Sequence, residues 1–198
     1  MKVVIEHVEP KVSEWLFIEY RHSAQIWGKD ILFTNVKATD DREILKPLGA
    51  VESRRFFEIF EKDIIILDPK AEKVLSPNDF KKCSCLVIGG ILGCEVMGGR
   101  TKTLITDEAK KSSKNVLLRN IGPVQFPIDQ AALVAKRIYE GKRFCDLDIK
   151  EGVEIVLEED DKENFSRTVE LPYGYVSEKG KVMFAPGFIE YLKKDWDM

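Results

Sequence analysis

The sequence predicts an α/β fold, in which a mostly parallel sheet carries helices on both of its faces. Short runs of consecutive apolar, largely β-branched residues recur through the first part of the 198-residue chain, as in strands that are buried on both faces. Amphipathic segments with helical spacing lie between these runs. Strands that alternate with helices are typical of a parallel sheet, and hydrophobic residues, at 44% of the chain, are numerous enough for a sizeable core.

Each element is predicted from its local pattern. The strands predicted for the parallel sheet are Val3–Ile5, Ile31–Phe33, Ile64–Leu67, Leu86–Ile88 and Val116–Leu118. The helices predicted between and after them are Ser13–Trp27, Glu52–Phe60, Ser76–Lys81, Asp107–Lys111 and Asp129–Tyr139. The last of these is the clearest, because its apolar residues recur in helical phase and Gly141 follows as a stop.

The pattern changes after Gly141. Short strands are predicted over Val153–Leu157, Thr168–Leu171 and Lys181–Phe184, and a last helix over Phe188–Lys194. No repeat, low-complexity linker or clear boundary interrupts the chain. We therefore expect one domain over residues 1–198, with residues 142–198 as a C-terminal extension.

Composition argues against several classes of function. The apolar runs are far too short to span a bilayer, and no secretory leader precedes the first strand, so we expect a cytoplasmic protein without a membrane partner. The net charge of −3 argues against strong, sequence-independent binding to a phosphate backbone. None of the four cysteines forms a CxxC pair, and only two histidines could complete a ligand set, so we expect free thiols and no metal site.

Two loops point to a nucleoside-binding slot. Gly89, Gly90 and Gly93 follow the strand Leu86–Ile88, and a second loop, from Asn120 to Pro127, leads into the clearest helix. Glycine lets a backbone approach a ligand closely, and apolar side chains can sandwich a flat ring whose edge is read by backbone N–H and C=O groups. No GxGxxG follows the first strand, which weakens a dinucleotide-binding interpretation. An adenine nucleoside fits the two loops best.

These segments resemble the SPOUT methyltransferases. The motifs that carry the resemblance are Leu67-Asp68-Pro69, the loop Gly89 to Gly93, and the loop Asn120 to Pro127, in which Ile-Gly-Pro-Val-Gln is the most specific part. The resemblance implies a trefoil knot within about residues 64–141 and S-adenosylmethionine as cofactor, with S-adenosylhomocysteine as product. It assigns cofactor binding to Leu67, Asp68, Pro69, Gly89, Gly90, Ile91, Leu92, Gly93, Asn120, Ile121, Gly122, Val124, Gln125 and Phe126. Arg100 either faces the cofactor's carboxylate or forms a surface ion pair.

The resemblance narrows to one SPOUT branch and covers nearly the whole chain. The motifs lie along the whole chain: Ile5 to Glu9, Ser13-Glu-Trp15, Glu19-Tyr20, the two segments Gly-Gly-Ile-Leu-Gly and Gly-Gly-Arg-Thr, Arg119 to Gln125, and Leu171-Pro-Tyr173. That branch holds a protein-arginine methyltransferase whose substrate is a ribosomal protein, and it was formerly described as an RNA methyltransferase branch. Cys94 departs from the pattern, because an acidic residue is expected after the Gly-rich segment, and Glu95 is the nearest substitute.

The chemistry of an arginine acceptor predicts a carboxylate at the site. A carboxylate orients the guanidinium in paired hydrogen bonds and accepts a proton as the methyl group arrives. The candidates are Glu95, which follows the cofactor loop, then Glu6 and Asp129, although Asp129 also suits a helix N-cap and Glu6 a solvated loop. An arginine of a ribosomal protein is thus the first expectation. An RNA methyltransferase and a non-catalytic S-adenosylmethionine-binding module remain alternatives, and the superfamily resemblance allows a homodimer.

Overall fold

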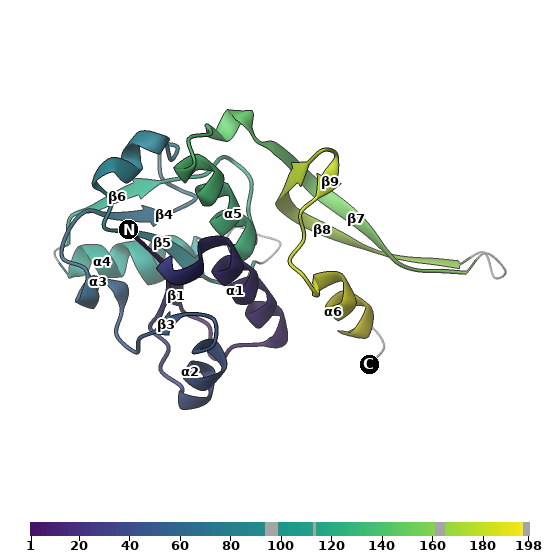
Figure 1. Cartoon of the computed structure of the whole chain (residues 1–198), viewed down its shortest axis with the longest axis horizontal. Coiled ribbons are helices and arrows are strands. Elements are labelled where there is room, and N and C mark those ends of the chain that lie inside the picture. Colours follow the sequence, from purple (N-terminus) through teal and green to yellow (C-terminus); the bar gives the residue numbers. More distant parts are fainter. Residues whose placement is uncertain (94–98, 113, 161–164, 196–198) are drawn as a thin grey trace.

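The described residues form one parallel and one antiparallel sheet. The computed structural model describes residues 1–93, 99–112, 114–160 and 165–195. Six strands form the parallel sheet in the order β3-β2-β1-β5-β4-β6, and three form the antiparallel sheet in the order β7-β8-β9. Figure 1 shows the antiparallel strands as a long ribbon beside the parallel sheet, with α6 at its side. This arrangement confirms the predicted fold class: a mostly parallel sheet with helices, followed by C-terminal strands.

The parallel sheet contains all five predicted strands. They are β1 (Lys2–His7), β2 (Ile31–Thr34), β4 (Ile64–Leu67), β5 (Cys85–Gly90) and β6 (Val116–Arg119). A two-residue strand, β3 (Ala50–Val51), was not predicted; it pairs with β2 at one edge. All pairings in this sheet are parallel, so the carboxyl ends of β4, β5 and β6 meet at one side of the sheet.

Helices cover both faces of the parallel sheet. On one face, α1 (Glu14–Trp27) and α5 (Ile128–Tyr139) enclose a core that includes Val3 and Ile5 of β1. On the other face, α3 (Phe56–Ile59) and α4 (Asp107–Lys111) cover a second core that includes Val4. Successive side chains of a strand point to opposite faces, which explains how one short strand serves both cores.

The other helical segments differ from the predictions in length or type. The predicted helix Glu52–Phe60 is reduced to the four residues of α3, and Ser76–Lys81 is a 3-10 helix over Pro77–Lys82. A π-helical turn, Lys102–Thr106, precedes α4. The short helix α2 (Thr39–Leu45) was not predicted, because only Asp41 and Leu45 of its side chains are buried and it shows little periodicity. Two further 3-10 turns span Gly28–Asp30 and Phe144–Asp146.

The C-terminal strands are longer than predicted. β7 (Asp148–Asp160) and β8 (Phe165–Glu178) pair antiparallel, with bulges, and β9 (Lys181–Val182) adds a short third strand. The last helix, α6 (Phe188–Asp195), agrees closely with its prediction. A third apolar cluster joins this unit to α1 through Ile18, and the Trp15 ring packs edge-on against Phe188. No helix in the described residues is long and apolar enough to cross a membrane.

Candidate functional site

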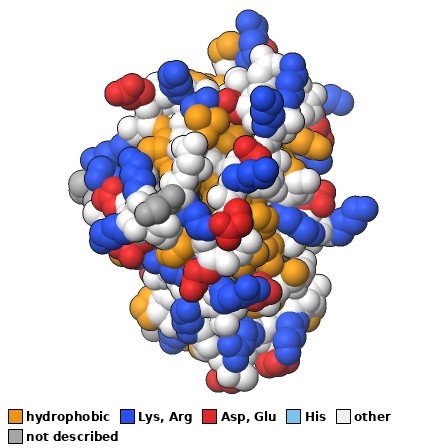
Figure 2. All heavy atoms as spheres, turned by 90° about the vertical axis from the view of Figure 1, so that its left-hand side faces the viewer, with side chains coloured by type: hydrophobic (Ala, Val, Ile, Leu, Met, Phe, Trp, Pro, Cys, Tyr) orange, Lys and Arg blue, Asp and Glu red, His pale blue; other side chains and the backbone are white. Residues whose placement is uncertain are grey.

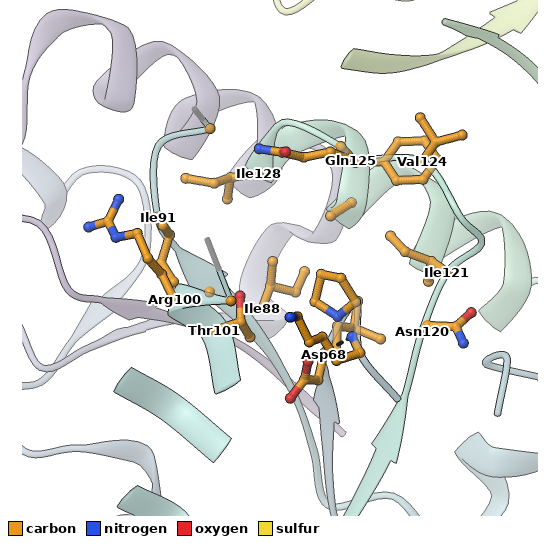
Figure 3. Close-up of a pocket in the computed structure, with 18 of the residues that line it drawn as sticks. Asp68, Ile88, Ile91, Arg100, Thr101, Asn120, Ile121, Val124, Gln125 and Ile128 are labelled. Atoms are coloured by element: carbon orange, nitrogen blue, oxygen red, sulfur yellow. Dashed lines mark hydrogen bonds between the residues drawn. The ribbon is translucent and has the colours of Figure 1, made fainter. Parts of the chain in front are cut away.

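A pocket opens where β4, β5 and β6 end. It encloses about 930 Å³ of empty space, its open mouth included. Figure 3 shows side chains from the loops after these strands, and from the start of α5, turned toward one common space. Open α/β sheets commonly bind ligands at this place, because the loops at the carboxyl ends of parallel strands are free to shape a crevice.

Most of the predicted cofactor-binding residues line this pocket. They are Leu67, Asp68, Pro69, Gly89, Ile91, Leu92, Gly93, Arg100, Asn120, Ile121, Gly122, Val124, Gln125 and Phe126. Six further residues line it that the sequence analysis missed: Lys70, Ile88, Gly99, Thr101, Ile128 and Ala131. Ile128 and Ala131 lie three residues apart on α5, so the helical repeat that follows the loop was the signal for them.

The pocket joins apolar walls to a few polar groups. Ile88, Ile91, Ile121, Val124 and Phe126 provide apolar surface suited to a flat ring such as adenine, while Asn120, Thr101 and Arg100 bring polar groups to the same space. The residues present therefore fit S-adenosylmethionine, which combines an adenine, a ribose and a charged amino-acid tail.

Asn120 anchors the third loop to a distant part of the chain. Its backbone N–H donates to the Lys73 carbonyl at 2.9 Å, and its carbonyl accepts from the Leu75 N–H at 2.8 Å. Its side-chain amide donates to the Ala71 carbonyl at 2.7 Å, and its side-chain oxygen accepts from the Gly122 N–H at 3.0 Å. These bonds fix the loop before any ligand binds, and the loop crosses close against the segment after β4, as the predicted knot requires.

Two of the predicted glycines serve packing. Gly122 has φ +98°, and a Cβ there would lie 2.1 Å from the Phe144 ring, so glycine is required for both conformation and space. Gly90 does not line the pocket: a Cβ there would lie 2.2 Å from the Tyr20 hydroxyl. Direct contact between Gly90 and the cofactor stays a prediction, and the place of Gly90 outside the pocket lining argues against it.

Arg100 lines the pocket and also forms an ion pair with Glu9. Its guanidinium is 3.0 Å from the Glu9 Oε1, and the same oxygen accepts from the Leu92 N–H at 3.0 Å. Glu9 therefore ties the first Gly-rich loop to Arg100. Contact between Arg100 and the cofactor's carboxylate stays a prediction, for which this residue is in place at the pocket wall.

The three predicted catalytic carboxylates have different positions. Glu95 lies outside the described residues. Glu6 is fully buried on the α3 face, where it accepts from Arg55 Nε at 2.7 Å and from the Phe56 N–H at 3.2 Å, and it does not line the pocket. These contacts give Glu6 a structural role and disfavour the catalytic one. Asp129 is buried at the start of α5, directly after the pocket residue Ile128.

Asp129 belongs to a buried polar cluster with Glu19. Its carboxylate lies 2.7 Å from His22 Nδ1 and accepts from the Gln130 side-chain amide at 3.0 Å. Glu19 accepts from the Ile128 N–H at 2.9 Å and from Trp15 Nε1 at 2.5 Å. Burial, and then the negative charge of Asp129, raise the pKa of Glu19 well above the usual carboxyl range. Glu19 belongs to a motif of the family resemblance, Glu19-Tyr20, but it was not predicted as a site residue.

No group of three or more potential metal-ligating side chains was found among the residues that the structure describes. Cys83, Cys85 and Cys145 are free thiols.

Comparison with known proteins agrees with this site. The family model "Protein arginine N-methyltransferase SFM1-like" matches residues 2–198. The Saccharomyces cerevisiae protein arginine N-methyltransferase SFM1 is 29% identical over 214 residues, covering 98% of this chain and 95% of that protein. The crystal structure of that yeast enzyme with SAM aligns with a TM-score of 0.85 at 25% identity, over 100% of this chain and 92% of that one.

Two further structures define the fold. The yeast enzyme with SAH aligns with a TM-score of 0.83 at 25% identity, over 97% and 94% of the two chains. The dual-specific Trm10 of Thermococcus kodakaraensis aligns with a TM-score of 0.59 at 20% identity, over 74% and 96%, and shares the fold alone. Because the family model spans almost the entire sequence, the chain belongs to the SFM1-like family of protein arginine N-methyltransferases, with the SPOUT fold and S-adenosylmethionine as cofactor.

Proposed function

We propose that this protein transfers a methyl group from S-adenosylmethionine to an arginine side chain of a ribosomal protein. The observation that carries the proposal is the pocket at the ends of β4, β5 and β6, with buried carboxylates directly behind its wall at Ile128. The family assignment supports a protein-arginine acceptor. The ribosomal acceptor rests on the branch motifs, above all Arg119 to Gln125 and Leu171 to Tyr173.

The residues of the pocket have the tasks that methyl transfer requires. Bound S-adenosylmethionine supplies an already activated methyl group, so the protein's main contribution is proximity and orientation. The apolar walls would hold the adenine, and Arg100, which is paired with Glu9 here, would be available at the pocket wall for the carboxylate of the cofactor. The acceptor nitrogen gains the methyl group and loses one proton, which a carboxylate beside the pocket accepts. Glu95 stays a prediction for that role, since it lies outside the described residues.

The first experiment separates protein from RNA acceptors. The purified protein is incubated with methyl-labelled S-adenosylmethionine and ribosomes, and aliquots are digested with nuclease or protease. We expect label that survives nuclease, is lost with protease, and is recovered as methylarginine after hydrolysis. Label lost with nuclease would contradict the proposal.

One observation favours the RNA alternative. A second hollow beside the pocket is lined by Lys70, Lys73, Lys102, Lys110 and Arg119, with Asp68 and Glu72 as its two carboxylates. Cations around a cleft suit a phosphate backbone. Two of them are already paired, Lys102 with Asp107 and Arg119 with Asp79, which lowers the charge available. On the face seen in Figure 2, Lys and Arg side chains are interspersed with Asp and Glu, which favours a protein acceptor.

The homodimer and the cytoplasmic location stay predictions. A concentration-dependent sedimentation measurement on the whole chain decides the first. Localisation of a tagged chain in cells decides the second.

A further inference from the structure

The buried carboxylates of this protein differ in how their charge is balanced. Glu6 pairs with Arg55, and Asp129 lies against His22. Glu19 is also buried, yet its two described hydrogen bonds come from neutral donors, the Trp15 indole and the Ile128 amide. Among the described contacts, the histidine therefore belongs to Asp129, and Glu19 has no basic partner. A buried negative charge without a cation is costly, so a cationic partner would bind there favourably.

A hydroxyl group points to the same cluster. Tyr175 of β8 is 2% exposed, and its hydroxyl oxygen has no hydrogen-bond partner within the described structure. The next residue, Val176, donates its N–H to the Gln130 side-chain oxygen at 3.0 Å, and the Gln130 amide donates to Asp129 at 3.0 Å, so this part of β8 packs against the start of α5. The negative charges of Asp129 and Glu19 raise the pKa of the Tyr175 hydroxyl. An unpartnered buried hydroxyl costs free energy, because it has lost water without gaining a partner. A ligand with hydrogen-bonding groups would satisfy it.

The cluster is connected to the cofactor pocket in two ways. The Ile128 amide donates to Glu19, while the same residue lines the pocket, so a single residue separates the carboxylate from the cofactor space. Tyr173 and Tyr175 of β8 both pack in the third apolar cluster. The Tyr173 ring lies beside Gly93, 2.7 Å from where a Cβ would be.

The surroundings suit a guanidinium. Trp15 and Tyr173 are half-buried members of the same apolar cluster as Tyr175. Aromatic faces attract cations, and carboxylates bind the planar donor fork of a guanidinium with paired hydrogen bonds. Because the proposed function has an arginine acceptor, a guanidinium site is needed near the cofactor pocket.

Resting on the proposed function, we propose that Glu19, with Asp129 and Tyr175, binds the guanidinium of the acceptor arginine. Glu19 releases its proton to solvent as the guanidinium binds and then supplies the negative charge, Asp129 lies beside it at the start of α5, and the Tyr175 hydroxyl completes the hydrogen bonds.

A purely structural role for Glu19 would be to cap the N-terminus of α5 through the Ile128 amide. A neutral side chain serves that role without a buried charge. Replacement by glutamine therefore separates the two roles, because it keeps a hydrogen-bond acceptor of the same shape and removes only the charge.

The first test uses Glu19→Gln, with methyl-labelled S-adenosylmethionine and acid-extracted ribosomal proteins. We expect kcat/KM for the protein acceptor to fall about 100-fold, as when one partner of a buried charge pair is removed. Affinity for S-adenosylhomocysteine, measured by calorimetry, should stay within about twofold of wild type. The matched control is Glu14→Gln, an exposed acid on the same helix, which should leave both quantities unchanged. A Glu19→Gln variant with wild-type kcat/KM would overturn the proposal.

The pH dependence of kcat/KM distinguishes the two roles of Glu19, because a residue that only caps α5 would not affect it. The groups that face Glu19 are Asp129 on α5, Tyr175 on β8, and Tyr20 and His22 on its own helix. Because Glu19 must be ionised to bind the acceptor, kcat/KM in the wild type should rise with pH through its raised pKa. Glu19→Gln should lose that rise, and a profile of wild-type shape in the variant would contradict the assignment.

A second test keeps this inference separate from the proposed function. Protein loaded with S-adenosylhomocysteine is titrated with a neutral peptide that contains one arginine, and with the same peptide containing citrulline. We expect saturable binding for arginine only, lost in Glu19→Gln and weakened about 20-fold in Tyr175→Phe, as for one hydrogen bond to a charged group. Equal binding of both peptides to wild type, or unchanged arginine binding in Glu19→Gln, would overturn the guanidinium site. Absence of methyl transfer with arginine binding intact would instead overturn the proposed function.

Discussion

Glu6 and Glu19 are both buried beside the same parallel sheet, on opposite faces. On the α3 face, Glu6 receives hydrogen bonds from Arg55, Thr34 and the Phe56 amide, so its charge and its lone pairs are matched. On the α1 face, Glu19 accepts hydrogen bonds from two neutral donors, the Trp15 indole and the Ile128 amide, and a second carboxylate, Asp129, lies nearby. The difference shows that burial alone does not mark a functional acid. An unmatched charge is what distinguishes a site that awaits a ligand from one that holds the fold together.

The largest effect is expected when Glu6 loses its cation. Arg55→Met would leave a buried carboxylate unpaired, and we expect the free energy of unfolding to fall by about 3 kcal/mol. Urea unfolding at pH 7 measures it. The matched control is Arg54→Met, whose ion pair with Glu52 is exposed and should contribute less than about 1 kcal/mol. Similar small losses in both variants would show that Glu6 does not depend on its partner.

The next effect is expected at the pocket side of α5. Ala131→Leu adds three carbons toward the cofactor space, and we expect affinity for S-adenosylmethionine to fall about 100-fold through overpacking. Calorimetry measures it, with Ala50→Leu on the exposed edge strand as control. The stability of Ala131→Leu should depend on pH as in wild type, because the acidic cluster is untouched. Unchanged affinity would remove this face of α5 from the cofactor site.

A moderate gain in stability, rather than a loss, is expected when Glu19 is replaced by glutamine. Its pKa in the folded protein is raised to about 8, so the folded state binds more protons than the unfolded state between about pH 4.5 and 8. Stability should therefore fall as pH rises through that window, and Glu19→Gln should abolish this loss. We expect the variant to match wild type near pH 4.5 and to exceed it by on the order of 2 kcal/mol at pH 9. Parallel stability curves for the two proteins would contradict the unmatched charge.

The smallest effect is expected at Tyr175. Tyr175→Phe removes a buried hydroxyl that has no partner, so we expect unfolding to cost about 1 kcal/mol more than in wild type. Thermal unfolding measures it, and Tyr139→Phe, whose side chain is exposed, is the control. A loss of stability would indicate that the hydroxyl is hydrogen-bonded in solution.

The sequence alone predicted the parallel core well. Runs such as Ile64–Leu67 are apolar at every position, which only a strand buried on both faces requires, and all such runs are strands. The loops after β4, β5 and β6 were found because their glycines and their resemblance to a family are local signals. Gly141 was also a local signal, because its φ of +101° suits the glycine that follows the end of α5.

What the sequence did not predict depends on contacts between distant residues. Glu19 is one of many acids on helices, and only its packing against α5 and β8 gives it an unmatched charge. Likewise, the predicted strands are shorter than β7 and β8. The reason is that many polar residues lie along the paired strands and hide the apolar pattern from which a strand is predicted. The role of Gly90 depends on the Tyr20 hydroxyl, far away in the chain.

The pocket wall formed by Val124, Gln125 and Phe126 is backed by a segment that a ribosome makes much later. The Gly174 N–H donates to the Gln125 carbonyl at 2.8 Å, and a Cβ on Gly174 would overlap Val124 and Phe126. Chains emerge from their N-terminus, so a nascent chain holds all three cofactor loops before β8 exists. The cofactor site is therefore completed only late in translation. A chain stalled before β8 would lack the support for this wall, and we expect it to bind the methyl donor more weakly.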